Sequence, residues 1–433
     1  MSLFEVNVGP KEADWIGTTN EVIQGAVDQV AAAGGGVVRI LPGTYAMYDS
    51  LHLRSNVTVR GSGSETVLWK PPSVRSKVLY SNGYGLYSVS VAEPDKFPIG
   101  CGVHITDDRA VGFYDTVATV TWMDGNELGL SQALNHDIGG LANGTVTSVY
   151  PIISGRAVEN VIVESLVVDG NAASNAYLHG CRGGGIFLLR TDRLQIKDVR
   201  VQHYNGDGIS FQQCVDTLIE RCCCTGNTGS GLHPGSGSVG FAFRGTSCLD
   251  NGKDGIYYYC LRVSYSLCED CVIEGNGQDG LSIGHRDTDV VIRRNHIASN
   301  SRHGIYIRED QDGLSGQRTW VEANVFRDNC RLAGDGDICF ASEVDDFHIV
   351  RNEFHPVGRG GSNKTAIHLQ QAPRGMVIHD NLIENGELLN AVDPSVRERI
   401  LRHDCNSSNA SGLHRIPLEA VRHLNKVTDR SLP

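Results

Sequence analysis

The sequence predicts an all-β solenoid, in which the chain winds through stacked coils of parallel strands. The first observation is a short phrase, glycine followed by Ile or Leu, that returns every 23 to 25 residues from Gly185 to Gly304. The second is a set of apolar and asparagine positions that follows the phrase in successive repeats. The third is the richness in β-branched residues and the lack of long helical periods between Gly155 and Asn385, which argues against a helical or leucine-rich solenoid.

The glycine phrase gives the predicted length of one coil. Repeats of about two dozen residues with strand-like apolar alternation are typical of solenoids whose coils stack on one another. Equivalent residues of neighbouring coils then lie about 4.8 Å apart, so like side chains stack on like. The copies begin at Gly185, Gly208, Gly231, Gly255, Gly280 and Gly304, with looser copies at Asp337-Ile338 and Ala366-Ile367.

An asparagine recurs at one position of the later repeats, three residues after an apolar position. Its side-chain amide can bond to the next asparagine and to turn backbone that would otherwise be buried and unpaired. We interpret these residues as structural rather than catalytic. The predicted internal ladder consists of Asn295, Asn324, Asn352 and Asn381.

The N-terminal segment predicts a helix that covers one end of the solenoid. Thr18-Thr19-Asn20-Glu21 is typical of a capping box, and the helix is expected to end at Gly34-Gly35-Gly36. Such a helix would shield core and strand edges that an open solenoid leaves exposed. The apolar residues at helical spacing are Val22, Ile23, Ala26, Val27 and Val30.

This helix, the triple glycine, the turn Leu41–Tyr45 (LPGTY) and the segment Asn56–Gly63 (NVTVRGSG) resemble the N-terminal part of the pectate-lyase-like superfamily. With the coils, the resemblance covers most of the chain. It implies a right-handed parallel β-helix. The superfamily includes polysaccharide lyases, polygalacturonases, mannuronan C5-epimerases, inulin fructotransferases and phage tailspikes, so it implies a carbohydrate-related function without naming one reaction.

The regular repeat is interrupted before its central part. Thr116–Thr121, the turn Asp124-Gly125-Asn126 and Leu128–Leu130 predict a β-hairpin there, within an insertion that could form one wall of a groove. Near the C-terminus, Pro394–Arg402 and Leu418–Lys426 predict helices. The expected domains are an N-terminal cap helix with the first coils (1–66), a β-rich insertion (67–154), the parallel β-helix core (155–385) and a C-terminal cap (386–433).

The composition restricts the partners. A net charge of −12 without a basic tract disfavours nucleic acid and anionic membranes. No run of 18 apolar residues is present, and the first residues lack the regions of an export signal. Because many unpaired thiols suit a reducing compartment, we expect a cytoplasmic protein as the sequence stands, or a secreted one if the natural N-terminus was truncated. Several superfamily members are trimers, so the sequence leaves open whether this protein forms a homo-oligomer.

Thirteen cysteines raise the question of a metal site, and Cys268 and Cys271 have zinc-ligand spacing. We interpret them as small hydrophobic residues, because they fall on the apolar positions of the repeat. Calcium is common in pectate-cleaving relatives, and Asp310-Gln311-Asp312 or Asp335-Gly336-Asp337 could offer oxygen ligands, although such sequences are usual in turns. We expect no cofactor, with Ca²⁺ as the alternative.

The candidate site lies on the outward face of the central coils. In each phrase the Ile or Leu points inward, so the residue after it and the residue two further on point outward. Aromatic rings suit sugar rings, while histidine, tyrosine and carboxylates transfer protons. The candidate catalytic residues are His233, Tyr257, Tyr259, His285, Asp287, Arg308 and Glu309, and the candidate substrate-binding residues are Gln212, Arg286, Tyr306 and Asp310.

Ordinary structural roles remain possible for several of these residues. Tyr257 or Tyr306 could be packing under the insertion, and Arg308 with Glu309 could be a surface ion pair. We favour a binding site for a carbohydrate, because three tyrosines, two histidines and two arginines are unusual on a merely solvated strand face.

Lyase or epimerase chemistry on a uronate is slightly favoured. An arginine, Arg286 or Arg308, would hold the uronate carboxylate so that the proton on the adjacent carbon can be removed. A histidine of the candidate set would be the base and a tyrosine the acid. These are His233 or His285, and Tyr257 or Tyr259.

Two other function classes stay open. In a glycoside hydrolase or fructotransferase-like enzyme, Asp287 with Glu309 or Asp310 would flank the bond, and directly stacked carboxyl groups about 5 Å apart fit a retaining mechanism. A non-catalytic, tailspike-like glycan-binding protein is the third class. Family motifs match only in part. Asn205–Ile209 resembles the first polygalacturonase motif without the later aspartate pair, and Gly231–Pro234 resembles the epimerase strand without its aspartate.

Overall fold

The computed structural model describes residues 4–110, 112–259, 261–310, 313–355, 365–384 and 386–395. They form two compact units. Unit 1 comprises Met1–Leu189, Asp198–Ser210 and Asn227–Gly229, and unit 2 comprises Arg190–Lys197, Phe211–Gly226 and Ser230–Pro433. Parallel coils build both units, and unit 1 also carries an antiparallel sheet. The predicted all-β solenoid is confirmed.

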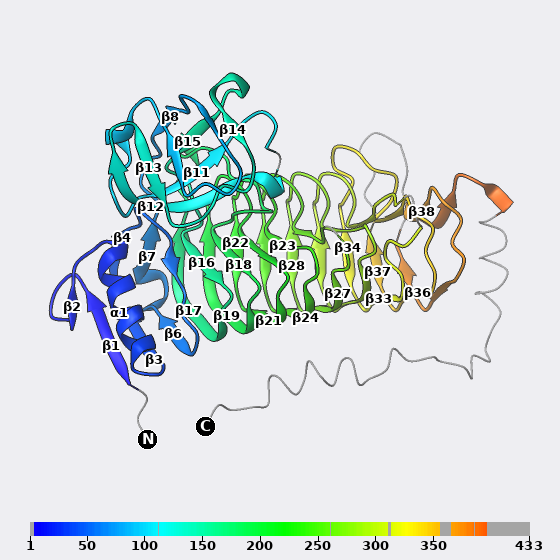
Figure 1. Cartoon of the computed structure of the whole chain (residues 1–433). Helices are drawn as coiled ribbons and strands as arrows, with labels where there is room; N and C mark the ends of the chain where they lie inside the picture. The colour runs from blue at the N-terminus through cyan, green and yellow to red at the C-terminus, as the bar shows by residue number, and fades with distance from the viewer. Residues whose placement is uncertain are drawn as a thin grey trace. The chain divides into compact units, whose positions relative to one another are not determined.

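Helix α1 (Asn20–Ala32) packs on strands β1 (Glu5–Gly9) and β3 (Gly36–Ile40) in unit 1, as Figure 1 shows in dark blue. Its buried face includes Ile23, Ala26, Val27 and Val30, as predicted, whereas Val22 is only half-buried. The predicted capping box is wrong, because Thr19 makes no side-chain capping bond. Instead, the Thr19 backbone bridges to Ala46, and the Asn20 side chain accepts a hydrogen bond from the Tyr48 amide.

The first coils of unit 1 are short parallel strands. Strand β3 pairs with β1 and β6, β17 pairs with β6 and β7, and β16 pairs with β5 and β18. Strands β2 and β4 pair with β1 and β7. The bounds of those not yet given are β2 Trp15–Ile16, β4 Gly43–Ala46, β5 Leu51–His52, β6 Val57–Arg60, β7 Thr66–Trp69, β16 Ile153–Arg156, β17 Glu159–Asp169 and β18 Ile186–Leu189.

An antiparallel sheet interrupts these coils, shown in cyan in Figure 1, and the predicted hairpin is confirmed within it. A separate apolar cluster that includes Val89, Phe97 and Leu128 fills its interior. The insertion is shorter than the predicted range 67–154. Strands β7 and β16, at the two ends of that range, pair with coil strands. The six strands of the sheet in spatial order are β10 Ser88–Ser90, β13 Glu127–Leu130, β12 Thr116–Asp124, β11 Gly102–Thr106, β15 Thr145–Thr147 and β8 Arg75–Lys77, and β9 Ser81–Asn82 pairs separately with β14 Ile138–Gly139.

Five short 3-10 helices lie among the strands of the described part of unit 1. They are Gly63–Glu65, Pro94–Lys96, Gly112–Tyr114, Gly140–Ala142 and Ala172–Ser174. Two of the unit boundaries fall within strands, namely β19 (Asp192–Gln202) and β20 (Ile209–Gln212).

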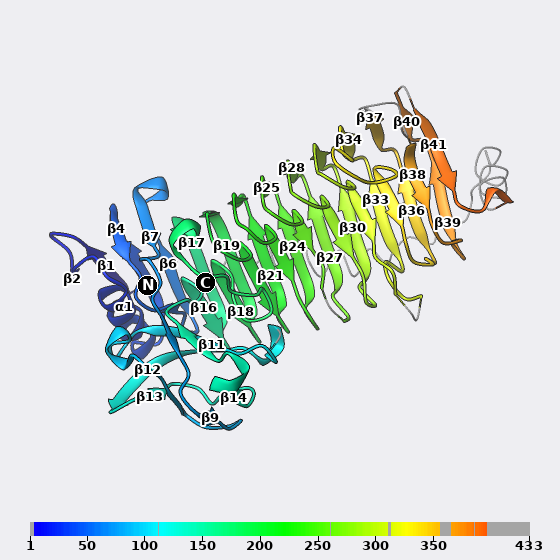
Figure 2. The ribbon, with the colours of Figure 1, turned by 90° about the horizontal axis from the view of Figure 1, so that it is seen from above.

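Unit 2 is a stack of coils with three parallel strand columns, seen from green to orange in Figure 2. The first column carries the glycine phrases: β23 Leu232–Pro234, β26 Ile256–Tyr257, β29 Leu281–Ile283, β32 Ile305–Ile307, β35 Ile338–Phe340, β38 Thr365–Leu369 and β41 Glu387–Ala391. The second is β21 Val215–Glu220, β24 Val239–Arg244, β27 Ser264–Glu269, β30 Thr288–Arg293, β33 Thr319–Glu322, β36 Phe347–Val350 and β39 Met376–His379. The third is β22 Cys223–Thr225, β25 Ser247–Leu249, β28 Val272–Glu274, β31 His296–Ala298, β34 Val325–Arg327, β37 Glu353–His355 and β40 Leu382–Ile383.

The predicted asparagine ladder is confirmed. The Nδ2 of Asn295 donates to Oδ1 of Asn324 at 2.9 Å, and the same bond joins Asn324 to Asn352 and Asn352 to Asn381. Each Nδ2 also donates to a backbone carbonyl of the preceding coil. Buried turn backbone is thereby satisfied, which is the structural role expected for these residues.

A second ladder runs through the other turn of the coils and escaped the sequence prediction. Asn251, Asn276, Asn300 and Asn329 are joined by Nδ2–Oδ1 bonds of 2.9–3.0 Å, and Asn329 donates to the carboxylate of Asp337. Its sequence signal is an asparagine four residues before a phrase glycine, as at Asn251 and Gly255.

The last described coil extends beyond the predicted core boundary at residue 385. Strand β41 pairs in parallel with β38 as far as Ala391, so this part of the predicted C-terminal cap is still coil. The predicted terminal helices lie almost wholly outside the described residues. In the described ranges, no helix has the length and apolar character needed to span a membrane.

Candidate functional site

The strand register of unit 2 confirms that the residues of the predicted column stack from coil to coil. Tyr257 pairs with Ser282, Ser282 with Tyr306 and Tyr306 with Cys339 in successive coils. The Ile or Leu before each of them is fully buried. Burial within the column is uneven, because Tyr257 and Tyr306 are half-buried while Ser282 is covered by its neighbours.

Five of the predicted residues come together as one group, which we call the aromatic–basic cluster: His233, Tyr257, Tyr259, His285 and Arg308. The rings of Tyr257 and Tyr259 stack with centroids 4.9 Å apart and an interplanar angle of 15°. The imidazole of His233 meets the edge of Tyr257 at 5.3 Å, and that of His285 meets Tyr259 at 5.8 Å. The cluster therefore combines a flat aromatic surface with two groups able to transfer protons.

Arg308 supplies the positive charge of the cluster. Its guanidinium carbon lies 4.6 Å from the ring centroid of Tyr257 and 5.7 Å from that of Tyr259. It donates to Ser282 Oγ at 2.7 Å and to the carbonyl of Tyr258. Gly284 makes this position possible, because a Cβ there would lie 2.7 Å from Arg308 Nε. A guanidinium has five N–H donors, so donors beyond these two bonds can engage a carboxylate.

A buried acidic layer, Asp254 and Asp279, lies beneath the cluster and was not singled out from the sequence. Ser282 Oγ donates to Asp254 at 2.8 Å, which links Arg308 to this carboxylate through one hydroxyl. The Asp279 amide donates to Asp254 Oδ1 at 2.9 Å. Burial, followed by the charge of Asp279, raises the pKa of Asp254 to about 6. The signal was in the sequence, because both aspartates directly precede a phrase glycine.

Asp279 is hydrogen-bonded to residues of the next coil. It accepts hydrogen bonds from the His303 amide and Arg302, with Nδ1 of His303 also within 2.9 Å of its carboxylate. The ring of His303 stacks on the predicted binding residue Tyr306 at 4.9 Å, and Arg302 lies 5.9 Å from the same ring. Burial raises the pKa of the Tyr306 hydroxyl. Tyr306 is thus partly a packing residue, with His303 and Arg302 as its partners.

Asp287, predicted as a catalytic carboxylate, is fully buried in a turn. It accepts hydrogen bonds from the backbone amides of Val263, at 3.0 Å, and Gly284, at 3.2 Å. Burial raises its pKa to about 7, although the two amides and Arg308, 3.9 Å away, oppose the shift. These contacts are those of a residue that joins adjacent coils.

The remaining predicted residues lie outside the aromatic–basic cluster. Gln212 is buried and packs over Gly235, where a Cβ would lie 2.1 Å from its amide nitrogen. Glu309 is exposed, and Asp310 and Arg286 are half-buried. The left-handed backbone of His285 and Arg286 recurs at Leu261 and Arg262 in the preceding coil, so it belongs to the repeated turn rather than to one special site.

The cysteines behave as apolar residues of the coils. Cys222, Cys224, Cys268 and Cys271 are buried, and the Cys271 thiol donates to the backbone carbonyl of Glu269. Burial raises the pKa of Cys248 well above its ordinary value, which keeps that thiol protonated. Among the residues that the structure describes, no group of three or more His, Cys, Asp or Glu side chains is arranged to hold a metal ion.

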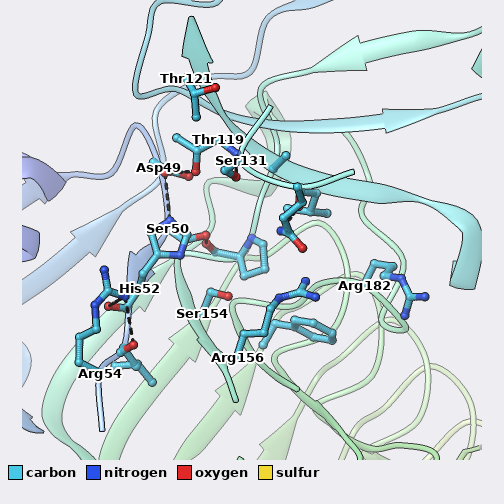
Figure 3. Close-up of a pocket in the computed structure, with 16 residues that line it drawn as sticks. Asp49, Ser50, His52, Arg54, Thr119, Thr121, Ser131, Ser154, Arg156 and Arg182 are labelled. Carbon is cyan, nitrogen blue, oxygen red and sulfur yellow. Dashed lines mark hydrogen bonds and ion pairs between the residues drawn. The ribbon is translucent and has the colours of Figure 1, made fainter. Parts of the chain in front are cut away.

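Unit 1 contains a pocket of about 410 Å³ (Figure 3), and the insertion forms one of its walls, although none of its residues was singled out from the sequence. Coil strands β5, β16 and β18 contribute residues to one side of it, and strand β12 of the antiparallel sheet contributes to the other. Its walls carry the charged side chains of Asp49, Arg54, Arg156 and Arg182 and the imidazole of His52. The repeat gave no signal for this pocket, because the antiparallel sheet that completes it lies outside the repeat.

Comparisons with known proteins agree with this architecture. A family model described as "Right handed beta helix region" matches residues 184–354. The chain is a right-handed parallel β-helix. A comparison of the sequence with curated proteins finds no match.

Several solved structures share the fold. The A-module of mannuronan C-5 epimerase AlgE6 from Azotobacter vinelandii has a TM-score of 0.56 at 16% identity, over 86% of this chain and 91% of that chain. An endo-xylogalacturonan hydrolase from Aspergillus tubingensis has a TM-score of 0.52 at 11% identity, with the same coverage. PfbA, a surface adhesin of Streptococcus pneumoniae, has a TM-score of 0.51 at 13% identity, over 86% of this chain and 89% of that chain. These identities show a shared fold and no shared reaction.

Proposed function

We propose that this protein is a carbohydrate-active enzyme that acts on uronate residues of a poly- or oligosaccharide, by β-elimination or C5-epimerisation. The observation that carries the proposal is the position of Arg308, held over two stacked tyrosine rings with a histidine at the edge of each. Similarity of fold to a mannuronan C-5 epimerase supports the same class of substrate.

The chemistry begins with the uronate carboxylate. Arg308 would neutralise it by charge-assisted hydrogen bonds, which acidifies the C5–H bond. A histidine at the cluster edge would then take the C5 proton. His285 is half-buried and His233 is almost fully buried, so His285 is the more accessible base. The tyrosine rings would support the sugar ring as an apolar platform.

The second step separates the two reactions. In β-elimination, the electron pair of the broken C5–H bond forms a C4–C5 double bond, the C4–O bond breaks, and the leaving oxygen takes a proton from a tyrosine hydroxyl such as that of Tyr259. In epimerisation, a proton returns to C5 from the opposite face of the ring and no sugar bond breaks. The same cluster can serve both, and the position of the acid relative to O4 or C5 decides between them.

A glycoside hydrolase is the second candidate. The proposed pair of Asp287 and Glu309 is weakened by the buried, amide-bonded state of Asp287. Asp254 is buried and bonded to a backbone amide as well, but its pKa is raised to about 6 and Ser282 connects its carboxylate to Arg308 of the cluster. The fold is also shared with hydrolases and with an adhesin, so a glycan-binding protein without catalysis is the third candidate.

The test is incubation of the purified protein with polygalacturonate, alginate and neutral glycans. Three readouts are needed: ultraviolet absorbance of an unsaturated product, reducing ends, and deuterium entering C5 from heavy water. We expect absorbance for a lyase, or deuterium without chain cleavage for an epimerase. Arg308→Gln and His285→Ala should each lower the rate by about 100-fold or more.

Arg327→Gln is the matched control, since Arg327 is an exposed arginine of unit 2 outside the cluster. It should retain full activity. Reducing ends without absorbance would transfer the assignment to hydrolysis, and Asp254→Asn would then be the variant to examine. If all three readouts stay silent while the glycans bind, the enzyme proposal is wrong and the protein is a glycan-binding one.

A further inference from the structure

The pocket of unit 1 is positively charged although the protein is acidic. Its lining holds three arginines, Arg54, Arg156 and Arg182, and one aspartate, Asp49, while Asp28 outside the lining is paired with Arg54, so the formal charge is 3 − 2 = +1. The chain as a whole carries −12. A local excess of positive charge in a concave site attracts anions, since field lines are focused there. The pocket is therefore suited to an anionic ligand.

Arg182 and Arg54 are held in place by other residues of the protein. Arg182 donates to the carbonyls of Cys181 and Phe113 and lies 5.6 Å from the Phe113 ring centroid. Arg54 is paired with Asp28 at 2.8 Å. Arg156 is exposed, and in Figure 3 its side chain lies between Ser154 and Arg182. Held guanidinium groups lose little conformational freedom when they bind a carboxylate.

A histidine in the same pocket is oriented by a buried carboxylate. His52 Nε2 lies 3.1 Å from Asp49 Oδ2, and that oxygen also accepts a hydrogen bond from Thr119 Oγ1 at 2.7 Å. The Asp49 side chain is 8% exposed and the His52 side chain 41% exposed. With Nε2 engaged by Asp49, the imidazole presents its other nitrogen, Nδ1, as a second polar group for a ligand.

The rest of the lining suits a hydroxylated ring. Thr119, Thr121, Ser131, Gln132 and Ser154 offer hydroxyl and amide groups, while the apolar lining residues Leu53, Pro151 and Phe187 are buried. The volume lies within the range of small-molecule sites, about 300–1,000 Å³. A phosphate would more often be met by the backbone amides of a helix N-terminus. Here the lining comes from strands and loops.

We propose that this pocket binds a sugar acid, with the carboxylate on the arginines and the hydroxyl groups on the threonine and serine side chains. The inference does not depend on the proposed reaction, because every residue that it uses belongs to unit 1. The pocket and the aromatic–basic cluster share no residue, so the proposal adds a second binding site.

The test is isothermal titration calorimetry with D-galacturonate and D-mannuronate, against D-galactose and inorganic phosphate. The protein carries Arg308→Gln, so that the aromatic–basic cluster cannot supply the binding. We expect a uronate to bind at least about 10-fold more tightly than galactose and phosphate. Adding Arg156→Gln should weaken uronate binding by at least about 5-fold. Arg75→Gln, at an exposed arginine of unit 1 outside the lining, should leave it unchanged.

The overturning results are equally concrete. Equal affinity for galactose would remove the role of the carboxylate, and tighter binding of phosphate would make this a general anion site. Uronate binding that survives both Arg156→Gln and Arg182→Gln would lie elsewhere. Binding that is present in the unaltered protein but lost in Arg308→Gln alone would belong to the aromatic–basic cluster. Melting temperatures of all variants separate lost binding from lost folding.

Discussion

The aromatic–basic cluster of unit 2 and the pocket of unit 1 are built in opposite ways. The cluster consists of outward positions that repeat from coil to coil, and its members largely contact one another, as Arg308 does with Tyr257. The pocket combines coil residues such as His52 with residues of a non-repeating sheet such as Thr119. A repeat therefore brings chemical groups together on a face, whereas a departure from the repeat creates enclosed space.

The largest expected effect tests the repeat itself. Asn324→Ala in the middle of the first ladder removes the acceptor of the Asn295 amide and the donor to the Ile292 carbonyl. Because each unsatisfied buried group costs about 1–3 kcal/mol, we expect a loss of at least about 3 kcal/mol in the free energy of unfolding, measured by urea denaturation. Asn381→Ala, at the half-buried last rung, should cost about a third as much. Equal losses would show that the ladder is not the source of the stability.

The next effect concerns the end of the second ladder. Burial raises the pKa of Asp337 to about 7 in the folded protein, from the ordinary value of 3.8. Between these values the folded state keeps a proton that the unfolded state releases, so this group's contribution to stability falls as pH rises from about 4 to 7. Asp337→Asn should keep the bond from Asn329 and raise the unfolding free energy by about 2 kcal/mol at pH 8.

The measurement is thermal unfolding of both proteins at pH 5 and pH 8. The difference between Asp337→Asn and the unaltered protein should be clearly larger at pH 8. A difference that is the same at both pH values would mean that Asp337 does not titrate in this range.

A smaller effect tests how the aromatic–basic cluster is positioned. Gly284→Ala places a methyl group 2.7 Å from Arg308 Nε, so the guanidinium has to move from its observed position. We expect about a 10-fold loss of the activity identified by the glycan panel, with a change of less than about 1 kcal/mol in unfolding free energy. Rates and urea curves check the two parts. Activity that stays unchanged would show that the observed position of Arg308 is not required.

The smallest effect concerns the pocket. Thr119→Val removes the hydroxyl donor to Asp49 while keeping the shape of the side chain. The loss of one hydrogen bond to a carboxylate should lower the unfolding free energy by about 1–2 kcal/mol, read from urea denaturation. Thr121→Val is the matched control, because Thr121 lines the same pocket and lies on the same strand. If both variants lose the same amount, the Thr119–Asp49 bond has no special role.

The repeat made much of the fold predictable. The glycine spacing and the asparagine positions predicted the register of the coils, and the turn at Gly125-Asn126 predicted the hairpin. The capping box failed because tertiary pairing of Thr19 with Ala46 replaced a local bond.

The candidate site was less predictable. Periodicity placed Tyr257 and Arg308 on one face, but it could not tell an exposed carboxylate from Asp287, whose partners are backbone amides. Such burial depends on how a turn folds over its own side chain. The insertion was expected to form one wall of a groove, but the residues around Asp49 were not predicted, because the pocket requires contacts between residues about 70 positions apart that follow no period.

The second ladder also bears on how the protein ages chemically. Asn251 and Asn276 are each followed by glycine, the sequence in which an asparagine side chain most readily cyclises onto the next backbone nitrogen and loses ammonia. That attack needs a mobile backbone and a free amide. In the ladder, the Asn276 amide nitrogen is bound to Cys248 and Asn300, and its oxygen accepts two bonds from Asn251. The folded coils thus protect these two asparagines from deamidation, and conversion to aspartate would mark molecules whose coils have opened.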